Sequence, residues 1–382
     1  MEKITIGVIG SGTMGMGIAQ VASIAGHRVI IHDANATALN KAQTQLQDQI
    51  NKLSAKGKIS VSDAVAITGR FYFSENLTAC SECDLIIEAI VEDIAIKKNL
   101  YTQLENIVSE KCLIASNASS LSITSLASGL NYPQRFLGLH FFNPVPLMPL
   151  VEIIPALQTN DATIHYAIEL IESWGKITVV AKDTPGFIVN RIARPYYSEA
   201  IRIYEEGFAD FATIDYAMTS VYGFKMGPFV LMDFIGNDIN YAVTNSVWES
   251  CFYEPRYKPS FTQRNLVSAG WLGKKSGRGY FNYNEAMPAP NTNDTELIKN
   301  IAWRILVMLI NEAADADYFK IATRDDIEKA MCNGVNYPKG LLQWAEEIGI
   351  QHCIETMDRL FNQYHEERYR CSVGLKNEVM KK

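Results

Sequence analysis

The hydrophobic pattern divides the chain into an alternating first part and a helical second part. Short apolar runs separated by stretches with helical spacing fill the first 182 residues, which predicts parallel strands connected by helices. We expect strands at residues 3–9, 27–33, 71–73, 84–90, 112–116 and 176–181, and helices at 14–25, 35–56, 93–109 and 161–174. After residue 182 the spacing is helical with few strand-like runs, so a second, mostly helical part begins there.

The helical part repeats itself when the sequence is shifted by 113 residues, without gaps. Ile188, Arg191, Glu199, Ala217, Gly227 and Gly236 then align with Ile301, Arg304, Glu312, Ala330, Gly340 and Gly349. The stretch between the copies is polar and contains prolines, as expected of a linker. We therefore expect an α/β domain at 1–182, a helical domain at 183–284, a linker at 285–296 and a second, degenerate helical domain at 297–382.

Residues 138–154 combine two apolar runs with three prolines between them. Because proline is poorly tolerated inside a strand, this pattern predicts a strand, a loop and a second strand. If the runs pair symmetrically about Pro146, His140 lies opposite Glu152, with Cβ atoms about 5 Å apart. A glutamate bound to one ring nitrogen would direct the other toward a substrate, as in a general base. On these residues alone, a histidine that only ties two strands together fits equally well.

The loop GSGTMG places Gly10, Gly12 and Gly15 between the first strand and the first helix, and Asp33 closes the next strand. Glycines permit a tight turn and a close approach to a pyrophosphate at the helix N-terminus, and the aspartate can accept both ribose hydroxyls. A carboxylate there repels a 2′-phosphate, so we expect NAD rather than NADP. The alternative is a glycine-rich turn followed by a chance aspartate.

Polar residues also follow other strands at the carboxyl edge of the sheet, where α/β proteins bind ligands: Glu92, Asn117, Ser119 and His140. Oxidation of an alcohol needs a base for the hydroxyl proton and a donor for the developing carbonyl oxygen. His140 with Glu152 suits the first role, and Ser119 with Asn190 suits the second. Ser119 as a helix N-cap and Asn190 as a residue that caps or bridges helices are the structural alternatives.

The repeat distinguishes between the two interpretations of Asn190. The second copy has Trp303 at this position, whereas the following arginine is retained as Arg304. A structural requirement would be shared by both copies. We therefore expect Asn190 to belong to a site that only the first copy completes.

Composition excludes several classes of function. A net charge of −7 without concentrated lysine and arginine argues against a nucleic-acid surface. No apolar run approaches the ~18 residues of a membrane-spanning helix, and the N-terminus lacks a secretion signal, so we expect a cytoplasmic protein. Seven scattered cysteines fit reduced thiols. Cys80 and Cys83 form a C-x-x-C without a second pair, which predicts surface thiols before a strand and no metal site.

Several ordered motifs resemble those of the L-3-hydroxyacyl-CoA dehydrogenase family. They are GSGTMGMGIAQ, EAIVED, SNASSL, GLHFFNPVPLMPLVE, DTPGFIVNR and GKKSGRGYF, and they span residues 6–281. NRIARPYYSEA and GVNYPKGLLQWAEEIG are most similar to the two-repeat bacterial 3-hydroxybutyryl-CoA and 3-hydroxyadipyl-CoA dehydrogenases of phenylacetate breakdown. The resemblance implies a Rossmann-type NAD-binding domain followed by two homologous all-α domains. It also implies reversible, NAD-dependent oxidation of a (3S)-3-hydroxyacyl-CoA to a 3-oxoacyl-CoA.

Carried over to this chain, the resemblance implies that His140 is the general base, Glu152 its orienting partner, and Ser119 and Asn190 contacts to the substrate oxygens. The residues implied to hold NAD are Gly10, Gly12, Met14, Gly15, Asp33, Glu92, Lys97 and Asn117. Lys52, Lys56 or Lys58 would contact coenzyme A, although a solvated basic loop explains them nearly as well. Arg194 is our candidate for binding a distal carboxylate on a hydroxyadipyl group, and a structural arginine before Pro195 is the alternative.

Two other functions and two further properties stay open at this point. A dehydrogenase of free hydroxy acids or nucleotide sugars would rely on a lysine or cysteine that residues 183–195 lack. A non-catalytic NAD-binding protein would lack the histidine or its partner, and both are present. The acyl chain length is not fixed by these motifs. A second helical copy could replace a partner subunit, so homodimer formation is also undecided.

Overall fold

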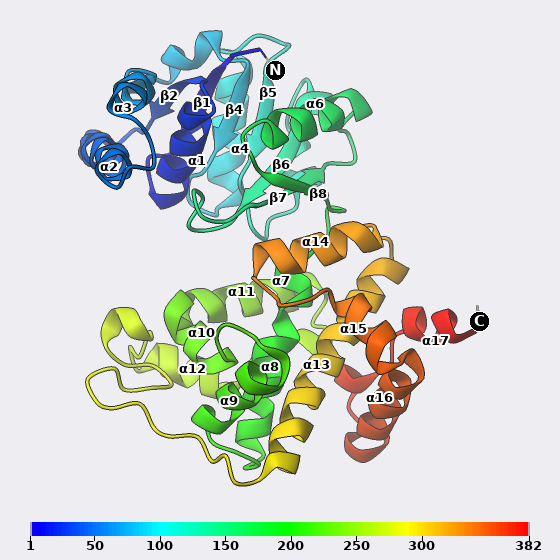
Figure 1. Cartoon of the computed structure of the whole chain (residues 1–382). Coiled ribbons are helices and arrows are strands. Elements are labelled where there is room, and N and C mark those ends of the chain that lie inside the picture. Colours follow the sequence, from blue (N-terminus) through cyan, green and yellow to red (C-terminus); the bar gives the residue numbers. More distant parts are fainter. Residues whose placement is uncertain (1, 381–382) are drawn as a thin grey trace. The chain divides into compact units, whose positions relative to one another are not determined.

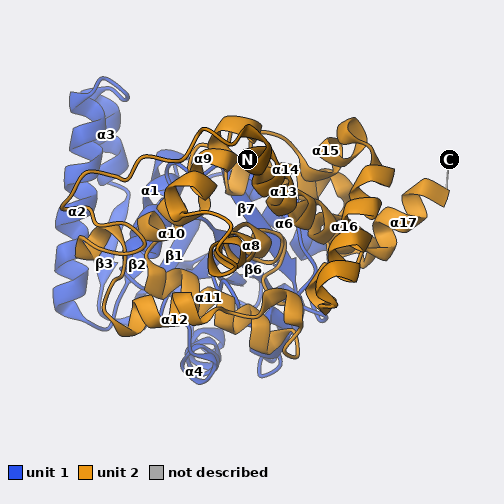
Figure 2. Cartoon of the chain, turned by 90° about the horizontal axis from the view of Figure 1, so that it is seen from below, with its two compact units in different colours: residues 1–184 blue, residues 185–382 orange. Residues whose placement is uncertain are grey.

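The computed structural model describes residues 2–380, and the chain forms two compact units, residues 1–184 and 185–382 (Figures 1 and 2). Within the described residues, no helix combines the length and the apolar character that crossing a membrane requires.

The first unit is an α/β fold around an eight-stranded sheet of order β3-β2-β1-β4-β5-β6-β7-β8 (Figure 1). The strands are β1 (Thr5–Ile9), β2 (Arg28–His32), β3 (Phe71–Ser74), β4 (Leu85–Glu88), β5 (Leu113–Ser116), β6 (Phe136–Phe141), β7 (Leu150–Pro155) and β8 (Ile177–Val180). The first six strands in this order, from β3 to β6, are parallel to one another. Strand β7 is antiparallel to β6, and β8 is parallel to β7. The predicted strands and the Rossmann-type alternation are confirmed.

The helices of this unit are α1 (Thr13–Ile24), α2 (Ala36–Ala55), α3 (Val61–Thr68), α4 (Ile94–Glu105), α5 (Ile123–Ala127) and α6 (Asp161–Glu172). Two of them, α3 and α5, were not predicted from the hydrophobic pattern. Helix α3 forms a hairpin with α2 and shares a small core of Ile50, Ala64 and Ile67. Helix α1 also lies against the β6–β7 loop, since a Cβ on Gly17 would come within 2.8 Å of Val145 Cβ.

The second unit is helical, and its elements recur. Its helices are α7 (Val189–Ile192), α8 (Arg194–Glu205), α9 (Phe211–Tyr222), α10 (Pro228–Ile235), α11 (Asn237–Ser250), α12 (Phe261–Ser268), α13 (Thr295–Tyr318), α14 (Arg324–Gly334), α15 (Leu341–Ile348), α16 (Ile350–Tyr364) and α17 (Val373–Met380). The series α9, α10, α11 returns as α14, α15, α16. Gly236 and Gly349 take the matching turns, with φ of +104° and +108°. The repeat is therefore confirmed, whereas the domain boundaries expected inside this compact unit stay predictions.

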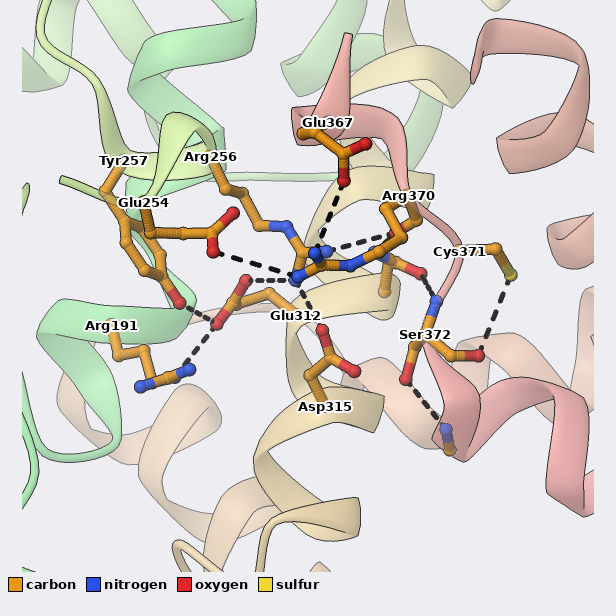
Figure 3. A network of polar contacts seen from close by, with 12 residues as sticks. Arg191, Glu254, Arg256, Tyr257, Glu312, Asp315, Glu367, Arg370, Cys371 and Ser372 are labelled. Atoms are coloured by element: carbon orange, nitrogen blue, oxygen red, sulfur yellow. Dashed lines mark hydrogen bonds and ion pairs between the residues drawn. The ribbon is translucent and has the colours of Figure 1, made fainter. Parts of the chain in front are cut away.

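The two copies exchange buried ion pairs. Arg191 Nε donates to Glu312 Oε1 at 3.0 Å, and the equivalent Arg304 Nε donates to Glu199 Oε1 at 2.6 Å. The hydroxyls of Tyr257 and Tyr369 donate to the same two carboxylates, and Arg256 and Arg368 lie against the second oxygen of each. Figure 3 shows Arg191, Arg256 and Tyr257 converging on Glu312. Each copy thus binds the buried glutamate of the other, as partners do across a two-fold interface.

We predict that Glu312→Gln destabilises the protein by about 3–5 kcal/mol, because it leaves Arg191 without its carboxylate partner and Arg256 with Asp315 alone. Urea denaturation followed by circular dichroism measures the free energy of unfolding. As a control, Asp358→Asn breaks the exposed ion pair with Lys376, and we expect a loss below about 1 kcal/mol. Equal effects of the two substitutions would contradict the structural importance of the exchange.

The stabilisation by Glu312 also depends on pH. Burial raises the pKa of Glu312, but Arg256 and Arg191 outweigh burial, so the folded-state pKa is lowered. A glutamate with a lowered folded pKa stabilises fully above its unfolded pKa and loses its contribution as the pH falls through the folded pKa. We predict that the difference in unfolding free energy between wild type and Glu312→Gln shrinks below about pH 4. Denaturation at neutral and at acidic pH measures it, and a constant difference would refute the argument.

Candidate active site

The β6–β7 hairpin pairs His140 with Glu152, in the register that symmetry about Pro146 predicts. His140 Nδ1 and Glu152 Oε2 are 2.6 Å apart, and the two side chains are 8% and 0% exposed. The predicted pairing is confirmed. A carboxylate at Nδ1 favours the ring form with a proton on that nitrogen, which places the basic lone pair on Nε2.

The backbone next to His140 is held by the end of the neighbouring strand. Asn117 follows β5, and its Oδ1 accepts a hydrogen bond from the backbone N–H of Phe141 at 2.8 Å. The ring of Phe142 lies 4.5 Å from that of His140, centroid to centroid. Asn117 therefore fixes the strand that carries the histidine, in addition to its predicted role toward a cofactor.

Ser119 lies against Glu92. Glu92 Oε1 accepts hydrogen bonds from Ser119 N at 2.7 Å and from Ser119 Oγ at 3.3 Å. The alternative of Ser119 as a helix N-cap is wrong, because Ser122 caps α5 by accepting a hydrogen bond from Ser125 N. Asp183 in turn accepts hydrogen bonds from the hydroxyl of Ser122 and from the first N–H groups of α5. Ser119 is thereby left outside the helix.

A buried carboxylate that the sequence did not reveal supports this arrangement. Glu88, at the end of β4, is fully buried and accepts hydrogen bonds from Lys97 Nζ at 2.6 Å and from Ser116 Oγ at 2.9 Å. It also accepts one from the hydroxyl of Tyr101. The only signal in the sequence was a single acid inside the apolar run DLIIEAI. Its position at the strand end could have indicated a polar partner.

Lys97 was expected to bind a cofactor, and its ammonium is engaged within the protein. Its side chain is 1% exposed, and Nζ also lies 3.3 Å from Glu92 Oε2. The ammonium of Lys97 therefore pairs with both Glu88 and Glu92, and Glu92 in turn accepts hydrogen bonds from Ser119. Through this chain of contacts Lys97 positions Glu92.

The three glycines of the loop differ in what a side chain at each position would contact. Gly10 has φ of +102°, and a Cβ there would lie 2.6 Å from the carbonyl oxygen of Ala89. A Cβ on Gly15 would lie 1.8 Å from the carbonyl oxygen of Gly10. A Cβ on Gly12 would meet no atom of the described residues within 4 Å, so the fold itself leaves room there. Gly12 stands directly before α1, where a helix N-terminus favours an anion.

Asp33 follows β2 and closes over this loop. Its Oδ2 accepts hydrogen bonds from Ser11 N and Ser11 Oγ at 2.9 and 2.7 Å, and Oδ1 accepts one from Asn35 N at 2.9 Å. Burial raises the pKa of Asp33, but these hydrogen bonds outweigh it and the net pKa is lowered. The carboxylate therefore stays charged at neutral pH, as repulsion of a 2′-phosphate requires. Met14, in the first turn of α1, packs partly against the core.

The remaining candidates lie elsewhere. Lys52 and Lys56 are exposed at the end of α2, and Lys58 is exposed in the turn before α3. Asn190 and Arg194 belong to the second unit, in α7 and at the start of α8. Contacts thus bring together the groups of the first unit at one sheet edge: His140, Glu152, Asn117, Ser119, Glu92 and Lys97.

The expectation of surface thiols at Cys80 and Cys83 is wrong. Both are buried, at 0% and 2% exposure, because the turn Leu77–Glu82 and the residue that ends it, Cys83, place the two thiols against Gly7 of β1. A Cβ on Gly7 would lie 3.1 Å from Cys83 Sγ, so the thiols fill space that this glycine leaves. No cluster of three or more metal-ligating residues occurs among residues 2–380.

Comparison with known proteins gives consistent matches. Residues 5–184 match the family model "3-hydroxyacyl-CoA dehydrogenase, NAD binding domain", and residues 186–283 and 301–380 match the corresponding C-terminal domain. The chain is 35% identical to a 3-hydroxyadipyl-CoA dehydrogenase of Escherichia coli, covering 97% of this chain and 96% of that protein. It is 39% identical to mitochondrial hydroxyacyl-coenzyme A dehydrogenase of Sus scrofa, over 72% of this chain and 90% of the relative. A crystal structure of 3-hydroxybutyryl-CoA dehydrogenase from Escherichia coli superposes with a TM-score of 0.95 at 34% identity, covering 100% and 99% of the two chains.

Two glycine variants separate ligand binding from folding. We predict that Gly12→Ala melts at the wild-type temperature but binds NADH at least about tenfold more weakly, because the added methyl group meets only the ligand. Gly15→Ala, by contrast, lowers the melting temperature because its methyl group overlaps the Gly10 carbonyl. Calorimetric titration and thermal melting measure the two effects. Wild-type NADH affinity in Gly12→Ala would contradict a pyrophosphate at this loop.

Proposed function

The chain belongs to the 3-hydroxyacyl-CoA dehydrogenase family, and we propose that His140 and Glu152 are the catalytic pair of its reaction. The protein is an NAD-dependent oxidoreductase that reversibly oxidises a (3S)-3-hydroxyacyl-CoA to a 3-oxoacyl-CoA. 3-Hydroxybutyryl-CoA and 3-hydroxyadipyl-CoA are the candidate substrates, in keeping with the names of its relatives. The buried contact between His140 Nδ1 and Glu152 Oε2 is the observation that carries the proposal.

His140 and Glu152 carry out the proton transfer of the reaction. His140 Nε2 takes the proton of the substrate's 3-hydroxyl group, and the imidazolium that forms is stabilised by the carboxylate of Glu152 on Nδ1. Bound NAD supplies the hydride acceptor, and Gly10, Gly12, Met14, Gly15, Asp33, Glu92 and Asn117 are the residues proposed to hold it. In the reverse direction His140 returns the proton to the oxygen.

Ser119 and Asn190 are proposed to bind the substrate oxygens. The hydrogen bond from Ser119 Oγ to Glu92 is long, at 3.3 Å, so the hydroxyl can turn toward a better acceptor. A hydroxyl and an amide N–H on the developing carbonyl oxygen stabilise it most as its negative charge grows. Asn190 comes from the helical unit, and the replacement by Trp303 in the second copy supports a role outside the repeat.

Further parts of the proposal concern the rest of the substrate and the setting. Exposed Lys52 and Lys56 suit the phosphates of coenzyme A, which attract ammonium groups without a fixed geometry.

All seven cysteines are free, which supports a reducing compartment such as the cytoplasm. Homodimer formation stays a prediction, to be tested by the molecular mass in solution.

We predict that His140→Ala lowers kcat for NADH oxidation with acetoacetyl-CoA by roughly 10² to 10⁴, since it removes the proton donor of the reverse reaction. NADH affinity and melting temperature show that the variant still folds and binds. His165→Ala, which changes an exposed histidine on α6, serves as the control and retains activity. A near wild-type kcat in His140→Ala would exclude the histidine as the acid–base group. Turnover of a free hydroxy acid but of no acyl-CoA would favour the competing dehydrogenase class.

A further inference from the structure

Arg194 is a buried cation without an acidic partner. It is 5% exposed, and burial lowers its pKa. Nε donates to the carbonyl oxygen of Asn190 at 2.9 Å, Nη1 donates to Thr244 Oγ1 at 3.1 Å, and the guanidinium lies 4.9 Å from the ring centre of Tyr197. No carboxylate among residues 2–380 forms an ion pair with it, and Nη2 makes no hydrogen bond to these residues.

Other buried arginines of the same unit show what this environment normally requires. Arg256 is equally buried, at 5%, and lies 3.0 Å from Glu312 with Asp315 as a second carboxylate. Arg368 is 7% exposed and lies 3.4 Å from Glu199. A buried charge is costly unless it is paired, so Arg194 departs from the pattern of its own fold.

A second unsatisfied donor lies nearby. Tyr337, between α14 and α15, is 5% exposed, and its buried hydroxyl has no hydrogen-bond partner within the described chain. The ring of Tyr337 lies 6.0 Å from that of Tyr196, and the ring of Tyr196 lies 5.8 Å from that of Tyr197, which the guanidinium of Arg194 contacts. Arginine has no acceptor, so it cannot receive the hydrogen bond that the Tyr337 hydroxyl has to donate. Both can donate to the same oxygen acceptor, and the charge of the guanidinium favours a negatively charged one.

The repeat shows that the fold does not need this arginine. In the second copy the position of Arg194 is occupied by Val307 and that of Tyr197 by Ile310, and both are fully buried. A buried charge replaced by well-packed apolar residues usually leaves stability unchanged or improved. The second copy therefore does not support the interpretation of Arg194 as a structural arginine before Pro195, just as Trp303 does not support a structural role for Asn190.

We infer that Arg194 and the hydroxyl of Tyr337 form a subsite for a carboxylate at the far end of the acyl group, as in a 3-hydroxydicarboxyl-CoA. The inference rests on the proposed function, in which Asn190 contacts the oxygen at carbon 3. Arg194 follows Asn190 by four residues, and its Nε donates to the carbonyl oxygen of Asn190 at 2.9 Å. The guanidinium therefore lies beside Asn190, as a short acyl spacer between a hydroxyl carbon and a terminal carboxylate requires. A bidentate guanidinium with a phenol donor matches carboxylate geometry.

The test compares 3-hydroxyadipyl-CoA with 3-hydroxyhexanoyl-CoA, which has the same number of acyl carbons and no distal carboxylate. We predict that Arg194→Met lowers kcat/KM for the adipyl substrate at least about thirtyfold, because one partner of a buried charge pair is lost. The hexanoyl value changes less than about threefold. Tyr337→Phe lowers only the adipyl value, by about tenfold.

Tyr280→Phe is the matched control, because its hydroxyl is also buried without a partner and it lies elsewhere in the unit. It leaves the ratio of the two kcat/KM values unchanged. Equal losses for both substrates in Arg194→Met and in Tyr337→Phe would overturn the subsite. Tyr337→Phe removes a single oxygen, so it decides the question even if Arg194→Met fails to fold. A wild-type enzyme inactive on both substrates would instead refute the proposed function.

Discussion

The antiparallel pairing of β6 with β7 is the constraint on which the chemistry of the first unit depends. Side chains alternate between the faces of a strand, so a shift of one residue would place His140 and Glu152 on opposite faces of the sheet. The hairpin loop adds a second constraint, because Val145 fills the space beside Gly17 on the helix that begins at the glycine loop. The strand register that pairs His140 with Glu152 and the helix proposed to receive the dinucleotide are thus fixed against each other.

Next to this pairing, a network of hydrogen bonds and ion pairs around two carboxylates fixes the side chains at the carboxyl edge of the sheet. Glu88 lies beneath the surface, Lys97 bridges it to Glu92, and Glu92 holds the backbone and hydroxyl of Ser119. A fully buried charge pair is costly unless every oxygen has a partner. Here Tyr101, Ser116 and the N–H of Ile90 supply the remaining donors to Glu88, so the network is satisfied and rigid. Rigidity of this kind keeps the hydroxyl of Ser119, which we propose to bind the substrate, at a defined place.

Patterns that depend on neighbouring residues in the chain were readable from the sequence, and those that depend on packing were not. The strands, the repeat and the His140–Glu152 register follow from alternation, period and symmetry about one proline. Glu88 was missed because a lone acid in an apolar run says nothing about which donors tertiary folding brings to it. Helix α3 is short and carries exposed Val61 and Val65, which weakens its amphipathic pattern, although Ser60 and Asp63 form a capping box. Choosing Ser122 over Ser119 as a cap required knowledge of Asp183, which is distant in sequence.

The exchanged glutamates of the helical unit have a consequence for assembly and for divergence. Joining both copies in one chain makes their association intramolecular, so it does not weaken when the protein is diluted. In a symmetric pair of identical subunits, every substitution appears twice and must suit both positions. In this chain a substitution appears once. Trp303 and Val307 occupy one copy while Asn190 and Arg194 occupy the other. In the proposed function, covalent linkage thus allows one copy to serve as scaffold while the other carries the substrate-binding residues.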